Sequence, residues 1–144
     1  MIKKNRLSTR IKKHEGFSKK VYLDQLGNTT IGYGHLVRKK DKIIENKNYS
    51  KIFLTKIFKK DLNKAIKQYE KLFIKCKLSP QAEEVVVEML FQLGINKFLK
   101  FKKMIKALKN KDYNKAAKEI LISKLHKQVP TRAKALSGLM KKAK

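Results

Sequence analysis

The hydrophobic pattern of the chain changes once, near residue 50, and this change limits the folds that the chain can adopt. Residues 17–35 combine β-forming side chains with several glycines, which is typical of a small antiparallel sheet with tight turns. From residue 50 onward, apolar side chains recur at helical intervals. The sequence therefore predicts an α+β fold whose sheet is confined to the amino-terminal part. The β-formers are Val21, Tyr22, Thr29, Thr30, Ile31 and Tyr33.

Helix boundaries can be placed from capping residues. A short helix is expected over residues 7–15, with Gly16 at the usual position of a left-handed cap. Ser50 is expected to cap a long helix. Its apolar stripe consists of Leu54, Ile57, Phe58, Leu62, Ala65, Ile66, Tyr69 and Phe73. We interpret Phe58 and Tyr69 as core residues and not as platforms for stacking sugars.

The second half of the chain is predicted to be entirely helical. Ser79 followed by Pro80 indicates a helix start, and Gly94 a helix end. That helix is apolar on two faces, which is typical of the centre of a bundle. Three further helices are expected over residues 101–108, over residues 113–121 with Asp112 as cap, and after Pro130.

These elements suggest one domain, residues 1–144, divided into lobes. We expect an α+β amino-terminal lobe over 1–49, an interlobe helix over 50–73 and a helical lobe over 74–144. A chain of this length buries enough surface to fold without a metal or a disulfide. Cys76 is the only cysteine, and we interpret it as an ordinary thiol.

The chain is strongly basic, with 38 Lys and Arg against 11 Asp and Glu, a formal net charge of +27. Such a charge attracts polyanions, so a nucleic-acid-binding or anionic-membrane-binding protein is an alternative function. Zinc-finger spacing, leucine heptads and aromatic RNA-binding motifs are missing from the sequence. Cationic amphipathic helices over 97–111 or 130–144 would suit membrane disruption. A solvated basic surface and a selected binding surface are both compatible with the even spread of charge.

The basic amino terminus is not followed by an apolar run of signal-peptide length, and no run approaches a membrane span. We therefore expect synthesis in the cytosol. By default, we expect a monomer that needs no protein partner.

Two of the scarce acidic residues lie close together in the sequence, at Glu15 and Asp24, with Thr30 six residues later. Glycoside hydrolysis requires such a pair, one acid to protonate the leaving oxygen and one carboxylate to activate water. Glu15 ends a predicted helix, where the helix dipole favours its protonated form, so it is the better general acid. Asp24 lies in a polar turn, which makes it the better anion. Two arbitrary acids at this spacing would more often be solvated surface groups.

The residues around this pair carry a family resemblance. The segments are His14-Glu15-Gly16-Phe17, Tyr22-Leu23-Asp24-Gln25, and Gly27-Asn28-Thr29-Thr30-Ile31-Gly32-Tyr33-Gly34-His35. They resemble the active-site signature of glycoside hydrolase family 24, the phage lysozymes and endolysins, in residue type and in interval. Phe91-Gln92-Leu93-Gly94 and Gln128-Val129-Pro130-Thr131-Arg132-Ala133 resemble later segments of the same family.

The resemblance implies a lysozyme-like fold and a muramidase that cuts the β-1,4 bond between N-acetylmuramic acid and N-acetylglucosamine. Glu15 would be the general acid, Asp24 would position or activate water, and the Thr30 hydroxyl would help to hold that water. Members of the T-even type invert the anomeric centre. The family needs no metal or cofactor. The biological role of the enzyme would be lysis of a bacterial host. The enzyme would remain in the host cytoplasm until a holin opens the inner membrane.

The resemblance also implies which residues contact the saccharide. These are Leu36, Phe91, Lys103, Glu119 and, beside the cleft, Gly34. Lys103 and Glu119 depart from the small polar side chains of the T-even type, which affects the expected subsite contacts.

The resemblance addresses two further positions, one of which departs from the family. Arg132 corresponds to an arginine that pairs with the catalytic glutamate, and Glu88 replaces an asparagine of the central helix.

Asp61 falls on the apolar stripe of the long helix, where an unpaired carboxylate would be costly. We expect an ion pair between His35 and Asp61, as the family has. His14 and His126 are expected at the surface.

Overall fold

The structure is a computed structural model that describes residues 4–144. The first three residues of the basic amino terminus, and with them the start of the expected lobe 1–49, lie outside the described residues. The described chain divides into two compact units, residues 4–63 and residues 64–144, here called the N-terminal unit and the C-terminal unit. The lobe bounds expected from the sequence remain predictions.

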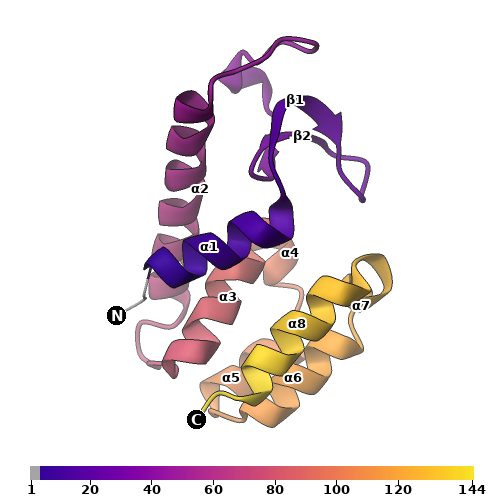
Figure 1. The fold of residues 1–144 in the computed structure, drawn as a ribbon. Coiled ribbons are helices and arrows are strands. Elements are labelled where there is room, and N and C mark those ends of the chain that lie inside the picture. The colour runs from indigo at the N-terminus through magenta and orange to yellow at the C-terminus, as the bar shows by residue number, and fades with distance from the viewer. Residues whose placement is uncertain (1–3) are drawn as a thin grey trace. The chain divides into compact units, whose positions relative to one another are not determined.

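The N-terminal unit begins with helix α1, Lys4–Glu15, which ends as expected at Gly16. Gly16 adopts a φ of +72°, and its N–H donates to the Lys12 carbonyl at 2.9 Å. Three antiparallel strands follow in the order β1-β2-β3, and the first two are labelled in Figure 1. They are β1 (Ser18–Leu23), β2 (Thr29–Gly32) and β3 (His35–Leu36). The α+β prediction is confirmed.

An aromatic cluster joins α1 to the sheet and to the long helix within this unit. Tyr33 lies in the β2–β3 turn, not in a strand as its β-propensity suggested, because positive-φ glycines flank it on both sides. Its ring centroid is 4.7 Å from that of Phe17 and 5.4 Å from that of Phe58. The Lys12 ammonium lies 5.0 Å from the Tyr33 centroid, a cation–π contact. The cluster ties the end of α1 to the turn that carries the glycine-rich motif.

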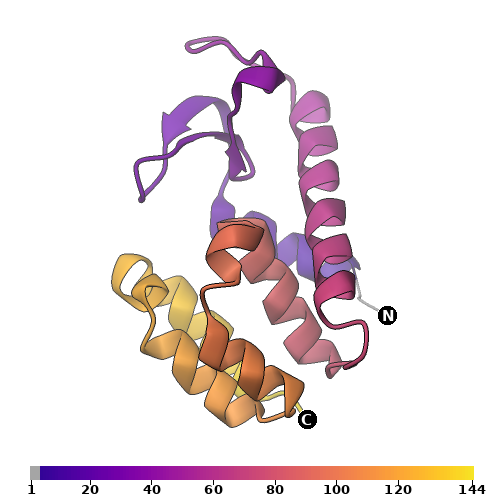
Figure 2. The ribbon, with the colours of Figure 1, turned by 180° about the vertical axis from the view of Figure 1, so that it is seen from behind.

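The long helix α2, Lys51–Leu72, is continuous in Figures 1 and 2. Ser50 caps it as predicted, because its Oγ accepts the Phe53 N–H at 3.1 Å. Phe58 and Tyr69 are buried, which agrees with their interpretation as core residues.

The C-terminal unit is helical, as expected. Its central helix, α3, begins at Pro80 and ends before Gly94, whose φ is +79°. Helix α6 packs against α5 and α8, and α8 also packs against α3 (Figure 1). The bounds are α3 (Pro80–Leu93), α4 (Ile95–Phe98), α5 (Lys102–Lys109), α6 (Tyr113–Leu121), α7 (Lys124–Gln128) and α8 (Pro130–Lys141).

Capping in this unit agrees with the sequence only in part. Asp112 caps α6 through its carboxylate, which accepts the Lys115 N–H at 3.1 Å. Ser79 is at the N-cap position of α3, but its side chain makes no capping hydrogen bond. The shortest elements have no clear signal in the sequence and were not predicted as separate elements; they are β3, α4, α7 and the 3-10 turn η1 (Lys39–Asp41). None of the helices in the described part of the chain is long and apolar enough to cross a membrane.

Candidate active site

Glu15 is the last residue of α1 and is half-buried. Its carboxyl group lies directly against the backbone of Gly34 in the β2–β3 turn. A Cβ built on Gly34 would be 2.6 Å from the carboxyl carbon of Glu15, closer than real contacts allow. Gly34 also has a φ of +76°, which side chains other than glycine rarely adopt. The turn therefore needs glycine for two reasons, and one of them is the position of the Glu15 carboxyl.

Asp24 lies in the β1–β2 hairpin and is held by three N–H donors. Its Oδ1 accepts the Leu26 N–H at 2.9 Å and the Asn28 N–H at 2.8 Å. Its Oδ2 accepts the Asn28 side-chain amide at 3.3 Å. The turn closes at Gly27, whose φ is +81°. These local bonds fix the orientation of the carboxylate while leaving it partly exposed.

Thr30 is buried in β2, with only 3% of its surface exposed. Its hydroxyl donates to the Asn28 carbonyl at 2.8 Å, so its remaining hydrogen-bonding capacity is as an acceptor. The strand register places Thr30 opposite Tyr22 of β1 and Leu36 of β3. Because neighbours in register share a face of the sheet, the Thr30 and Tyr22 side chains lie on the same side.

Tyr22 belongs to this group, and the sequence analysis missed it. Burial raises the pKa of its hydroxyl, and the nearby negative charges of Glu15 and then Asp24 raise it further. The tyrosine therefore stays protonated near neutral pH, with its hydroxyl within the influence of both acids. The available signal was its position two residues before Asp24, because alternate residues of a strand share a face.

His35 is held by two carboxylates. The expected contact with Asp61 is present, with Nδ1 2.7 Å from Oδ2, and Asp41 lies on the other side, 2.9 Å from Nε2. Burial lowers the pKa of His35, but the hydrogen bonds and charges of Asp61 and Asp41 outweigh it, so the pKa is raised. For Asp41, burial raises the pKa, but the Arg38 N–H and His35 outweigh it and the pKa is lowered.

Asp41 was not anticipated from the sequence. It lies in η1, within a run of basic residues that reads as solvated surface, and only the fold of this turn brings it to His35. The signal that could have indicated it is an isolated acid six residues after His35.

The other predicted residues are distributed over the two units. Leu36 is on β3 of the N-terminal unit and is 46% exposed. In the C-terminal unit, Phe91 is at the end of α3, Lys103 is exposed on α5, and Glu119 is partly exposed on α6. Their assignment as saccharide contacts remains a prediction.

Arg132 of α8 is buried and donates from its Nε to Oε2 of Glu88 at 3.2 Å. Glu88 is fully buried in α3. This buried ion pair was not predicted, because a glutamate in a basic chain reads as a surface residue. The pairing of Arg132 with the catalytic glutamate remains a prediction.

The remaining candidates have no evident chemical role. His14 and His126 are partly exposed, and Cys76 is a free thiol at the edge of the C-terminal unit. Within residues 4–144, histidine, cysteine and acidic side chains form no group of three or more that is suited to hold a metal ion.

Comparison with known proteins places this arrangement in a family. The model of the family described as phage lysozyme matches residues 12–144. Probable T4-type lysozyme 1 of Dictyostelium discoideum is 30% identical, over 85% of this chain and 86% of the relative. Probable T4-type lysozyme 2 of the same organism is 31% identical, over 88% of each chain. The chain therefore belongs to the phage lysozyme family and is a glycosidase of the lysozyme type.

Proposed function

We propose that this lysozyme hydrolyses the β-1,4 bond between N-acetylmuramic acid and N-acetylglucosamine in peptidoglycan, with Glu15 and Asp24 as its working carboxylates. One arrangement carries the proposal: Glu15 ends α1 with its carboxyl group against the Gly34 turn, and the β1–β2 hairpin of the same sheet holds the Asp24 carboxylate. A glycosidase needs two carboxyl groups on either side of the bond that breaks.

The two acids divide the proton transfers. Glu15, at the negative end of the α1 dipole, donates its proton to the glycosidic oxygen as the bond from that oxygen to the anomeric carbon breaks. Asp24, already oriented by the Leu26 and Asn28 N–H groups, accepts a proton from the water that attacks the anomeric carbon. Exchange with solvent then returns a proton to Glu15 and removes one from Asp24.

Thr30 helps to orient the attacking water. Because its hydroxyl proton is donated to the Asn28 carbonyl, Thr30 offers the water lone pairs only. A water molecule that donates one hydrogen to Thr30 and one to Asp24 turns its own lone pair toward the sugar. Thr30→Val, which removes this acceptor, should therefore reduce turnover more than it reduces substrate binding.

The decisive experiment compares Glu15→Gln with wild type on purified, outer-membrane-stripped peptidoglycan, measuring turbidity and new reducing ends. Loss of the general acid should lower turnover by about 10³-fold. Glu45→Gln is the matched control, because Glu45 is exposed and this substitution also removes one negative charge. NMR of the first-formed anomer tests inversion. Equal release of reducing ends by wild type and Glu15→Gln would overturn the proposal.

The membrane-disruption alternative is not favoured by the packing of the two candidate helices. In α5 the apolar side chains Met104 and Leu108 are fully buried, and in α8 so are Leu136 and Met140. An amphipathic helix that inserts into a membrane surface needs this face available. Permeabilisation of anionic vesicles by Glu15→Gln would restore this alternative.

We place the biological role of the enzyme, within the same proposal, in lysis of a bacterial host. We propose that the enzyme stays in the host cytoplasm until a holin opens the inner membrane, and this route can be tested. Expression in the cytosol should leave cells intact, and opening of the inner membrane should cause rapid lysis by the wild type and not by Glu15→Gln. Lysis without that opening would contradict the holin-dependent route.

A further inference from the structure

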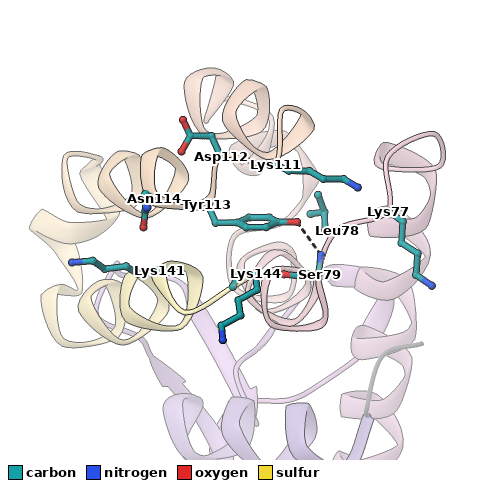
Figure 3. A pocket seen from close by; sticks show the side chains of 10 residues that line it. Lys77, Leu78, Ser79, Lys111, Asp112, Tyr113, Asn114, Lys141 and Lys144 are labelled. Atoms are coloured by element: carbon teal, nitrogen blue, oxygen red, sulfur yellow. Dashed lines mark hydrogen bonds between the residues drawn. The ribbon is translucent and has the colours of Figure 1, made fainter.

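The C-terminal unit contains a cavity of about 580 Å³ that the hydrolytic mechanism does not use. Three segments line it: the loop entering α3, the turn between α5 and α6, and the end of α8 (Figure 3). None of its lining residues comes from the N-terminal unit, which holds Glu15 and Asp24. Its volume is that of a site for a small molecule or for one segment of a polymer.

The lining of the cavity is strongly basic. Lys77, Lys111, Lys141 and Lys144 line it, together with one acidic side chain, Asp112. That carboxylate already accepts the Lys115 N–H as the cap of α6. In Figure 3, Lys77 and Lys111 lie on the side of the Tyr113 ring that carries the hydroxyl, and Lys141 lies on the other side. The lysines therefore come from three separate segments and surround an opening whose charge is not balanced locally.

Lys111 is held in a conformation that is rare for lysine. Its φ is +55°, in the left-handed region. The turn is fixed on both sides, because the Lys111 N–H donates to the Leu108 carbonyl at 2.9 Å and the Asp112 N–H donates to the Ala107 carbonyl at 2.8 Å. These two bonds are those of the left-handed cap that commonly ends an α-helix, here α5, and they fix the backbone of Lys111 at the lining.

Two hydroxyl groups of the lining have hydrogen-bonding capacity that the rest of residues 4–144 does not use. Tyr113 is 8% exposed, and its oxygen accepts the Ser79 N–H at 3.0 Å, which leaves its own O–H proton without an acceptor in the described chain. The Ser79 Oγ is buried and has no partner among the same residues. Because both groups line the cavity, each can donate a hydrogen bond to an acceptor of a bound ligand.

We propose that this cavity binds the phosphate group of an anionic ligand. Lysine ammonium groups bind phosphate as point charges, and four of them line the cavity. The start of α3, at the lining, adds the positive end of one helix dipole, whereas the start of α6 is already capped by the Asp112 carboxylate. The phosphate is carried either by a soluble phosphate ester or by a phosphate polymer of the bacterial envelope.

The test is a titration of the protein with tripolyphosphate and with glycerol 3-phosphate. Calorimetry and NMR measure the binding at a constant ionic strength of about 0.15 M. Lys77→Gln/Lys111→Gln removes two lining charges, and Lys97→Gln/Lys118→Gln removes two exposed charges elsewhere in the same unit. Both variants have the same net charge. We expect affinity to fall about fivefold or more in the first variant and less than about twofold in the second. Equal losses in both, or no saturable binding, would overturn the proposal.

Ser79→Ala separates binding from folding. Since the hydroxyl has no partner in the described chain, its loss should leave thermal stability nearly unchanged, yet lower phosphate affinity about threefold. Unchanged affinity would remove Ser79 from the site.

The source of the phosphate is decided by association with isolated cell walls before and after chemical removal of their phosphate polymers. Association that requires these polymers and also requires Lys77 and Lys111 assigns the envelope. Association that is independent of both, together with saturable binding of glycerol 3-phosphate, assigns the soluble ester. None of these measurements depends on Glu15, so they remain informative if the proposed hydrolysis fails.

Discussion

Two acidic side chains, Asp24 in the N-terminal unit and Glu88 in the C-terminal unit, are held in opposite ways. In the N-terminal unit, Asp24 takes all three of its hydrogen bonds from residues no more than four positions away and stays partly exposed. In the C-terminal unit, Glu88 is fully buried and contacts Arg132, which lies 44 positions away. A carboxylate held by its own turn remains available to a substrate, whereas one that joins two packed helices serves stability. With only 11 acids in the chain, this difference separates candidates for chemistry from structural groups.

The largest effect on folding is expected from Glu88→Gln. Loss of one charge from a buried ion pair is strongly destabilising, so the free energy of unfolding should fall by about 3 kcal/mol. Glu45→Gln, at an exposed position, should leave it unchanged. Chemical denaturation of both variants measures the difference. Equal stability of the two would show that the pair contributes nothing, and that the contrast between the units is wrong.

Gly34→Ala tests whether the N-terminal turn positions Glu15. A methyl group there would meet the Glu15 carboxyl carbon at 2.6 Å, so the acid must move, and displacement of a catalytic group should lower turnover by about tenfold to a hundredfold. Gly27→Ala is the matched control, because Gly27 has a similar φ of +81° but nothing within 4 Å of the added carbon.

Both glycine variants should lose about 1 kcal/mol of stability from backbone strain. Only Gly34→Ala should lose activity beyond that, in initial rates measured well below either melting temperature. Equal rates for the two variants would mean that the Glu15 carboxyl does not depend on the turn.

Much of the N-terminal unit was predictable because its signals are local. The interval from Glu15 to Asp24 and Thr30, the glycine caps and the helical stripe that includes Asp61 each depend on neighbouring residues. Asp41 was missed, because its approach to His35 depends on a short turn that has no periodicity. The Glu88–Arg132 pair was missed for a related reason: helical periodicity indicates which face is buried, but not which distant charge will neutralise a glutamate on it. Likewise, the cavity of the C-terminal unit is assembled from three segments that the sequence does not connect.

Asp61→Asn separates the two carboxylates that hold His35. Because the folded-state pKa of His35 is raised, its contribution to stability is complete below its ordinary value of 6.5 and is lost as pH rises through the raised value. The folded-state pKa of Asp41 is lowered, so its contribution is present above 3.8 and is lost as pH falls through the lowered value. The cluster is therefore most stabilising between these limits.

In that window, near pH 5.5, Asp61→Asn should cost about 1 kcal/mol, a value kept small by solvent screening of the partly exposed carboxylate. The difference from wild type should shrink at alkaline pH. Thermal unfolding across the pH range measures it, and a difference that does not vary with pH would exclude a charged His35 as its origin.

Tyr22→Phe is expected to have the smallest effect on activity, and it tests most directly whether the surroundings of Glu15 and Asp24 adjust their protonation. The Tyr22 hydroxyl stays protonated near neutral pH, because burial and the charges of Glu15 and Asp24 raise its pKa. It is therefore a neutral dipole near two acids that must hold different protonation states. Its removal should lower turnover only about threefold, but should shift the acidic or alkaline limb of the pH–rate profile, since those limbs report the two acids. Loss of the hydroxyl of a purely structural tyrosine would lower stability and leave both limbs in place.

The buried Tyr69 of the C-terminal unit provides the control. Its pKa is raised by burial and then by Glu83, and Tyr69→Phe should change stability alone. A shift of the profile in Tyr22→Phe, and not in Tyr69→Phe, would show that Tyr22 tunes Glu15 and Asp24 for chemistry, whereas Tyr69 beside Glu83 serves folding.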